Sequence, residues 1–105
     1  MEKSRLSLLL DYVQEAPQDP FNWYAIALEY QKIDPQQANF YFEHLLTHFG
    51  DYLPTYYVYA LHLINLGEDL KAESVFEKGI KLSKLQENWK TLRELQSAFE
   101  EWKFS

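Results

Sequence analysis

The sequence of 105 residues contains no cysteine, only three glycines and four prolines, and no long hydrophobic run. Without cysteine the chain has no disulfide, no thiolate nucleophile and no thiolate metal site. The apolar run near the N-terminus extends over about five residues before Asp11. A secretory signal needs roughly 7–15 apolar residues and a membrane span about 20. We therefore expect a cytoplasmic protein that does not act at a membrane.

Basic residues are also scarce, since 10 Lys and Arg face 16 Asp and Glu and leave a net charge of −6. Nucleic-acid binding needs a basic face that displaces counterions from phosphates. An acidic chain is also repelled by anionic membrane surfaces. The charge balance argues against nucleic-acid and membrane partners, and solubility alone accounts for the acidity.

Hydrophobic residues, by contrast, make up 47% of the chain, and aromatic residues alone make up 17%. A Phe, Tyr or Trp buries on the order of 150–250 Å² when it enters a core. This composition predicts one small domain over residues 1–105 with a core rich in aromatic side chains.

Apolar residues recur with the period of a helix throughout, and no stretch alternates as a half-buried strand does. The spacing, together with the helix start and stop signals, predicts an all-α fold of about six antiparallel helices with short connections. The expected helices cover 4–16, 19–32, 34–48, 54 to Gly67, 68–82 and 88–103.

The expected helix boundaries rest on a few residues with specific backbone preferences. Asp19-Pro20 and Asp34-Pro35 each combine an N-cap with a proline in the first turn. Gln37 lies three residues after Asp34, as in a capping box. Gly50 and Gly67 can adopt the left-handed conformation that ends a helix.

Residues 23–46 and 56–80 match each other once one extra residue is allowed between the two helices of the second copy. The positions alternate between small and large side chains, which lets helices approach each other while aromatic rings fill the space between repeats. The matched pairs are Trp23 with Tyr56, Ala27 with Ala60, Leu28 with Leu61, Ala38 with Ala72, Phe42 with Phe76 and Leu46 with Ile80.

These residues resemble the tetratricopeptide repeat pattern W-x-x-L-G-x-x-Y followed by A-x-x-x-F. The first copy reads Trp23-x-x-Ile26-Ala27-x-x-Tyr30, and the second ends in Ala72-x-x-x-Phe76-x-x-Gly79-Ile80. Three departures are a missing residue between the helices of the first copy, Leu45 in the place of Gly79, and no closing proline. The segments Pro54-Thr55-Tyr56-Tyr57 and Thr91-Leu92-Arg93-Glu94-Leu95 are similar to segments of short bacterial members.

The resemblance implies a short right-handed α-solenoid of antiparallel helix pairs. Its expected parts are an N-terminal helix (1–18), a first repeat (19–52), a second repeat (53–86) and a C-terminal capping helix (87–105). Because two repeats bury a continuous core only marginally, the flanking helices are expected to complete it.

The resemblance also implies that the first helix of each repeat lines a concave groove for a peptide or helix of a partner protein. The expected groove residues are Phe21, Tyr24, Leu28 and Gln31 in the first copy and Tyr57, Leu61, Ile64 and Asn65 in the second. The groove is apolar and aromatic, which suits an amphipathic helix or an extended apolar peptide. Members that bind acidic chaperone tails carry Lys and Asn where this chain has Tyr24, Leu28 and Val58. The alternative is that Tyr24, Leu28 and Leu61 pack between adjacent helices.

No residue pattern indicates catalysis or a cofactor. His44 and His48 are spaced to share a zinc ion, but such a site needs three or four ligands, and we expect no metal. The serines lack a strand-to-helix elbow and a Gly-rich oxyanion loop. We expect a protein that is not an enzyme.

Trp102 and Phe104 lie at the end of the chain, where few residues follow to cover them. They could pack on a second copy and give a symmetric homodimer, which makes a small self-associating structural unit the alternative function. Equally, both rings could fold back on the fifth expected helix.

Overall fold

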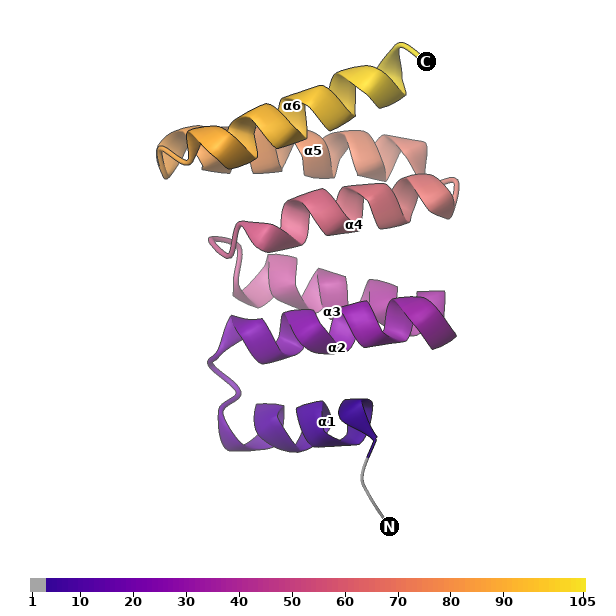
Figure 1. Cartoon of the computed structure of the whole chain (residues 1–105), viewed down its shortest axis with the longest axis vertical. Helices are drawn as coiled ribbons and strands as arrows, with labels where there is room; N and C mark the ends of the chain where they lie inside the picture. The colour runs from indigo at the N-terminus through magenta and orange to yellow at the C-terminus, as the bar shows by residue number, and fades with distance from the viewer. Residues whose placement is uncertain (1–3) are drawn as a thin grey trace. The chain divides into compact units, whose positions relative to one another are not determined.

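Six helices account for most of residues 4–105, the part of the chain that the computed structural model describes (Figure 1). They are α1 (Arg5–Glu15), α2 (Pro20–Ile33), α3 (Pro35–His48), α4 (Pro54–Asn65), α5 (Asp69–Leu85) and α6 (Trp89–Lys103). The chain divides into two compact units, residues 1–52 and 53–105. The predicted all-α fold of six helices packed in pairs is confirmed.

In the first unit, α1 packs on α2, and α2 packs on α3 in the antiparallel sense (Figure 1). Leu9 and Val13 of α1 meet Ala25 and Ile26 of α2 in a buried cluster. Partly buried aromatic rings, Trp23 among them, pack against this cluster, and the indole Nε1 of Trp23 donates to the carbonyl of Pro17 at 2.8 Å. Because Pro17 precedes α2, this bond fixes the connection between α1 and α2.

Asp34 is the only residue between α2 and α3. Its backbone N–H donates to the carbonyl of Tyr30 and ends α2, while its side chain accepts from the N–H of Gln37 at 3.3 Å and begins α3. The predicted N-cap is therefore present. The same residue closes one helix and opens the next, which explains why the first copy is one residue shorter than the second.

In the second unit, α4 packs on α5, and α5 packs on α6. Gly67 (φ 77°) ends α4 in a Schellman motif, in which the N–H of Gly67 donates to Ile64 and that of Glu68 donates to Leu63. The same motif ends α5, but there the left-handed position is occupied by Glu87 (φ 55°). Residue types with a Cβ adopt this conformation at a cost.

Positions that the repeat pattern assigns to the interior are buried. Ala27 and Ala60 are fully buried, as expected from the repeat pattern. Gly79 of α5 faces Tyr56 of α4, and Leu45, which holds the matching position of the first copy, is also fully buried.

Two sequence-based expectations about helix ends are wrong. Gly50 does not adopt a positive φ, and α3 ends instead where the N–H of Phe49 donates to the carbonyl of Leu45. The fifth helix also extends three residues beyond the expected Leu82 to Leu85, because the Schellman motif at Glu87 ends it without a glycine.

Candidate peptide-binding faces

The expected groove residues of the first copy lie on α2, within the first unit. Phe21, whose backbone N–H donates to the side chain of the N-cap Asp19, has 58% of its surface exposed, while Tyr24 is half-buried. The ring of Tyr24 meets that of Tyr52 edge-on at 5.7 Å. Burial, and then the neighbouring Tyr52, raise the pKa of Tyr24, so its phenol stays neutral and can donate a hydrogen bond at neutral pH.

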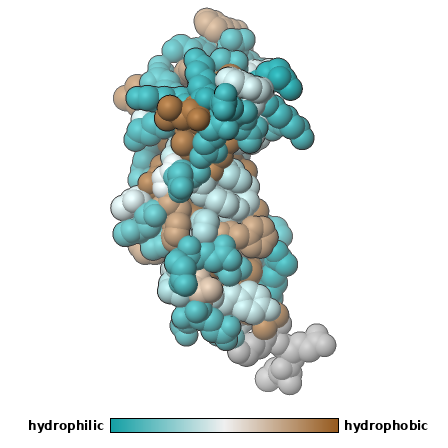
Figure 2. All heavy atoms as spheres, turned by 90° about the vertical axis from the view of Figure 1, so that its left-hand side faces the viewer, coloured by the Kyte–Doolittle hydropathy of each residue, from teal (hydrophilic) through white to brown (hydrophobic). Residues whose placement is uncertain are grey.

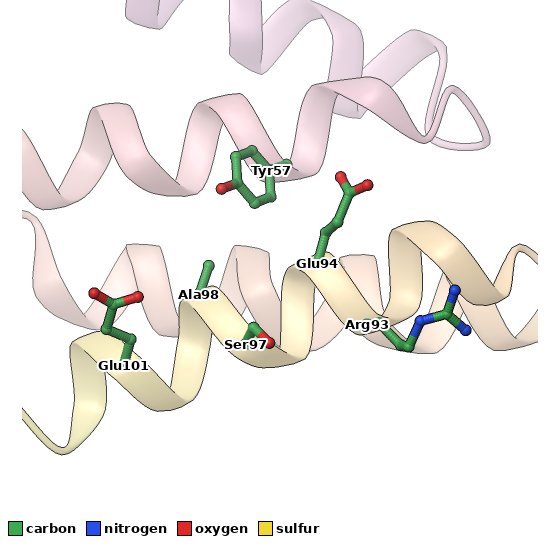
Figure 3. A pocket seen from close by; sticks show the side chains of 6 residues that line it. All are labelled: Tyr57, Arg93, Glu94, Ser97, Ala98 and Glu101. Atoms are coloured by element: carbon green, nitrogen blue, oxygen red, sulfur yellow. The ribbon is translucent and has the colours of Figure 1, made fainter.

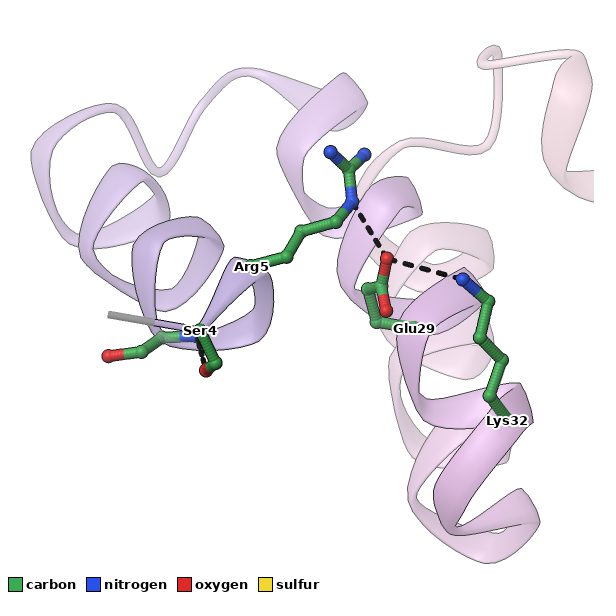
Figure 4. A network of polar contacts seen from close by, with 5 residues as sticks. Ser4, Arg5, Glu29 and Lys32 are labelled. Carbon is green, nitrogen blue, oxygen red and sulfur yellow. Dashed lines mark hydrogen bonds and ion pairs between the residues drawn. The ribbon is translucent and has the colours of Figure 1, made fainter. Parts of the chain in front are cut away.

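Leu28 and Gln31 line a pocket of about 580 Å³ between α1 and α2, together with Arg5, Ala25, Glu29 and Lys32. Figure 4 shows the ion pairs at its rim. Glu29 Oε1 lies 2.7 Å from Arg5 Nε and 3.5 Å from Lys32 Nζ. One carboxylate is thus shared by two cations that are both largely exposed, and the rim carries a net positive charge.

The expected groove residues of the second copy lie on α4, within the second unit. Tyr57 and Ile64 are half-buried, and Leu61 is 37% exposed. Asn65, the last residue of α4, is exposed.

Tyr57 lines a second pocket, of about 340 Å³, between α4 and α6 (Figure 3). We call it the α4–α6 pocket. Its other lining residues all come from α6 and are Arg93, Glu94, Ser97, Ala98 and Glu101. Four of these five are polar or charged, which gives the pocket a different chemistry from the apolar groove that the sequence led us to expect.

The residues contributed by α6 are not among the site residues expected from the sequence, although a signal for them is present. Glu94 follows Leu61 by 33 residues, as Leu61 follows Leu28, and Ser97 stands in the same relation to Ile64 and Gln31. By this spacing α6 corresponds to the first helix of a third repeat, as α2 and α4 correspond to the first helices of the two earlier ones. Its groove-side positions carry Glu94 and Ser97 where the earlier helices carry apolar or amide side chains.

The structure divides the expected groove residues among separate surroundings. In the first unit only Leu28 and Gln31 reach one pocket, while Phe21 and Tyr24 do not line it. In the second unit Tyr57 lines the α4–α6 pocket without Leu61, Ile64 or Asn65. On the face drawn in Figure 2, hydrophobic side chains form small groups among hydrophilic ones.

His44 and His48 lie side by side on α3, with ring centroids 4.6 Å apart. The ring of His44 also packs on that of Trp23 at 4.2 Å. Burial lowers the pKa of His44, and the charge of His48 lowers it further. Across residues 4–105, no three His, Cys, Asp or Glu side chains gather closely enough to hold a metal ion.

Trp102 and Phe104 have different environments. Trp102 stacks on Phe76 of α5 at 5.9 Å and on Phe99 at 6.2 Å. Phe104, beyond the end of α6, is 80% exposed. Of the two rings, Trp102 folds back on the fifth helix and Phe104 does not.

Antiparallel helix pairs with buried alanines and aromatic residues at matched positions of successive pairs define a helical repeat protein. Two solved structures of a tetratricopeptide repeat domain protein from Salinibacter ruber share this architecture. The solution NMR structure has 34% identity and a TM-score of 0.76, over 81% of this chain and 87% of that chain. The crystal structure has 33% identity and a TM-score of 0.73, over 79% of this chain and 93% of that chain. The chain belongs to the tetratricopeptide repeat family, and the predicted resemblance is confirmed.

No family model matches the chain, and no curated protein matches it. Among the helices of residues 4–105, none combines the length and the hydrophobicity that crossing a membrane requires.

Proposed function

We propose that this chain is a non-catalytic, cytoplasmic protein-interaction module that holds a peptide or helix of a partner protein on the exposed faces of α2 and α4. The observation that carries the proposal is the exposure of apolar groups at the expected groove positions, 58% for Phe21 and 37% for Leu61. Tetratricopeptide repeat domains generally serve as protein-interaction modules, which supports the same conclusion.

The two faces belong to the two repeats that we assign to residues 19–52 and 53–86, with 1–18 and 87–105 as flanking parts. Tyr24, Leu28 and Gln31 accompany Phe21 on α2, and Tyr57, Ile64 and Asn65 accompany Leu61 on α4. Apolar and aromatic groups with few charges suit the apolar side of an amphipathic helix or an extended apolar peptide.

A selection from a displayed library of random 20-residue peptides tests this proposal. The selected peptide is labelled with a fluorophore, and its Kd is measured by anisotropy for the wild type and for Phe21→Ala and Leu61→Ala. We expect these substitutions to raise the Kd about fivefold or more, because truncation of a central contact residue weakens binding by such a factor. Phe21 serves the test better than Tyr24, because loss of the Tyr24 ring would also remove its contact with Tyr52.

Phe40→Ala is the matched control. Phe40 lies on α3 and is 61% exposed, close to the 58% of Phe21, so both substitutions remove an exposed ring. The proposal predicts a Kd within twofold of the wild type for Phe40→Ala. Equal losses for Phe21→Ala and Phe40→Ala would contradict it, as would a library that yields no binder.

A second candidate function is self-association through the C-terminal end, and the 80% exposure of Phe104 favours it. Burial of so large an exposed ring is energetically favourable, and a second copy of the chain would bury it. Phe104, without Trp102, would then be the contact residue, because Trp102 already packs on α5.

A further inference from the structure

The α4–α6 pocket places an aromatic ring opposite two carboxylates. Tyr57 of α4 forms one wall, and Ala98 of α6 points toward its ring (Figure 3). Glu94 and Glu101 rise from α6 on either side of Ala98. They are seven residues apart, which is about two helical turns or roughly 10 Å along the axis. The ring therefore lies between two negative charges at opposite ends of the pocket.

Neither carboxylate forms an ion pair within residues 4–105. Within this part of the chain the ion pair that involves α6 joins Lys103 to Glu73, and the side chains of Glu94 and Glu101 take part in no ion pair or hydrogen bond. Arg93 also lines the pocket, but its guanidinium extends away from Tyr57 (Figure 3). The lining thus carries two negative charges and one positive charge that faces elsewhere.

We propose that the α4–α6 pocket receives a basic side chain, above all an arginine, of the partner peptide; this inference rests on the proposed function and specifies the chemistry of the partner. A cation over a tyrosine ring is attracted by the negative face of the ring. A guanidinium is planar and can bond to a carboxylate through two N–H groups while its face stacks on an aromatic ring. Tyr57, with Glu94 or Glu101 at its side, offers both contacts.

Other partner chemistries fit this pocket less well. An acidic peptide would bring like charges toward Glu94 and Glu101, and the net charge of −6 on the chain adds to that repulsion. A purely apolar segment would remove water from the carboxylates without replacing their hydrogen bonds. Ser97, between the two acids in sequence, adds a hydroxyl that can accept a further N–H.

A selection from displayed random peptides on the full chain tests the inference. We expect selected peptides to share an arginine or lysine. In the strongest binder, replacement of that residue by glutamine should raise the Kd for the wild type about fivefold or more, as the loss of a cation–π contact and an ion pair together predicts. For the double variant Glu94→Gln/Glu101→Gln the same change in the peptide should raise the Kd by a smaller factor than for the wild type, because only the contact with the Tyr57 ring remains.

Two control variants separate geometry from overall charge. Glu100→Gln removes the same charge as Glu101→Gln from the adjacent residue of α6, which is exposed and does not line the pocket. We expect Glu100→Gln to leave the Kd within twofold. Tyr57→Phe keeps the ring and should retain binding, whereas Tyr57→Leu should weaken it roughly two- to fivefold. Circular dichroism of each variant checks that the helices are retained.

Three results would overturn the inference. Equal losses of affinity in Glu100→Gln, Glu94→Gln and Glu101→Gln would show that only net charge matters. Selected peptides without a basic residue, whose Kd responds to Phe21→Ala but not to the Glu94→Gln/Glu101→Gln double variant, would remove this inference and leave the proposed function in place. A library that yields no binder would remove both.

Discussion

A Cβ atom added to Gly79 of α5 would lie 2.7 Å from the Cβ of Tyr56 on α4 and 3.1 Å from Cδ1 of Leu95 on α6. Real Cβ atoms essentially never approach another heavy atom to 2.7 Å. The Cβ of Tyr56 is close to the backbone and cannot turn away, so the two helices would have to move apart.

Gly79→Ala should therefore lower the free energy of unfolding by about 1–3 kcal/mol, the usual effect of overpacking a core. This sign is opposite to the gain that alanine brings over glycine at an open helical position. Urea unfolding followed by circular dichroism measures the change. An unchanged or higher midpoint would show that α4 and α5 separate without cost.

At the left-handed positions that end α4 and α5, we expect glycine to give a more stable protein than a residue with a Cβ atom. Glu87→Gly should raise the stability by about 0.5–1 kcal/mol, because glycine adopts φ near +55° without a Cβ clash. Gly67→Ala should lower it by about 1 kcal/mol, since Gly67 has φ 77°. Thermal unfolding of the two single variants tests the pair, and the same sign for both would contradict the expectation.

The position of His44 against Trp23 predicts lower stability in mild acid. The pKa of His44 is lowered in the folded chain, by burial first and by His48 second. The unfolded chain therefore takes up the proton at higher pH, near the ordinary value of about 6.5. Stability from this group is fully present above that pH and is lost as pH falls toward the folded pKa.

Urea midpoints for the wild type and His44→Gln between pH 7.5 and pH 5 measure this dependence, and a ¹H NMR titration of the His44 ring gives its pKa directly. We expect the urea midpoint of His44→Gln to decrease less in acid than that of the wild type. A pKa of His44 at or above the ordinary value in the NMR titration would contradict the argument from burial and charge. His48→Gln should raise the pKa of His44, since it removes one of the two causes that lower this pKa.

The two aromatic residues near the C-terminus should separate stability from self-association. Trp102→Ala removes the stack on Phe76 and Phe99 and should lower the free energy of unfolding by about 2–3 kcal/mol, below the cost for a fully buried ring. Phe104→Ala removes an exposed ring and should change it by less than about 0.5 kcal/mol.

Sedimentation at high concentration tests the second candidate function with the same variants. If Phe104 joins two copies, the wild type sediments as a dimer and Phe104→Ala as a monomer. A monomeric wild type at high concentration removes that candidate.

The helices and their repeat could be predicted from the sequence because the signals for them are local. Asp19 and Asp34 cap the helices that follow them, as their residue types indicated, and Ala27 and Ala60 are buried where the repeat pattern placed them. Local signals failed at helix ends that depend on context. Glu87 adopts a left-handed conformation that its residue type disfavours, and Gly50 does not adopt one that its residue type allows.

The candidate site was harder to predict, because a pocket depends on which helix faces which. From the sequence, α6 is expected only as a capping helix, and nothing in that expectation connects Glu94, Ser97 and Glu101 with Tyr57. The 33-residue spacing from Leu61 to Glu94 contained that connection. The period of the apolar residues also does not show how exposed a side chain is. The sequence therefore predicts the same role for Trp102 and Phe104, although of the two only Phe104 is exposed.

The single-residue connection at Asp34 also has a kinetic consequence. Closing a loop costs conformational entropy that grows with its length, and between α2 and α3 there is almost no loop to close. Contacts that are near in sequence form early in folding. We expect the α2–α3 hairpin to nucleate the first unit, with α1 docking afterwards, so an added residue beside Asp34 would slow refolding more than it speeds unfolding.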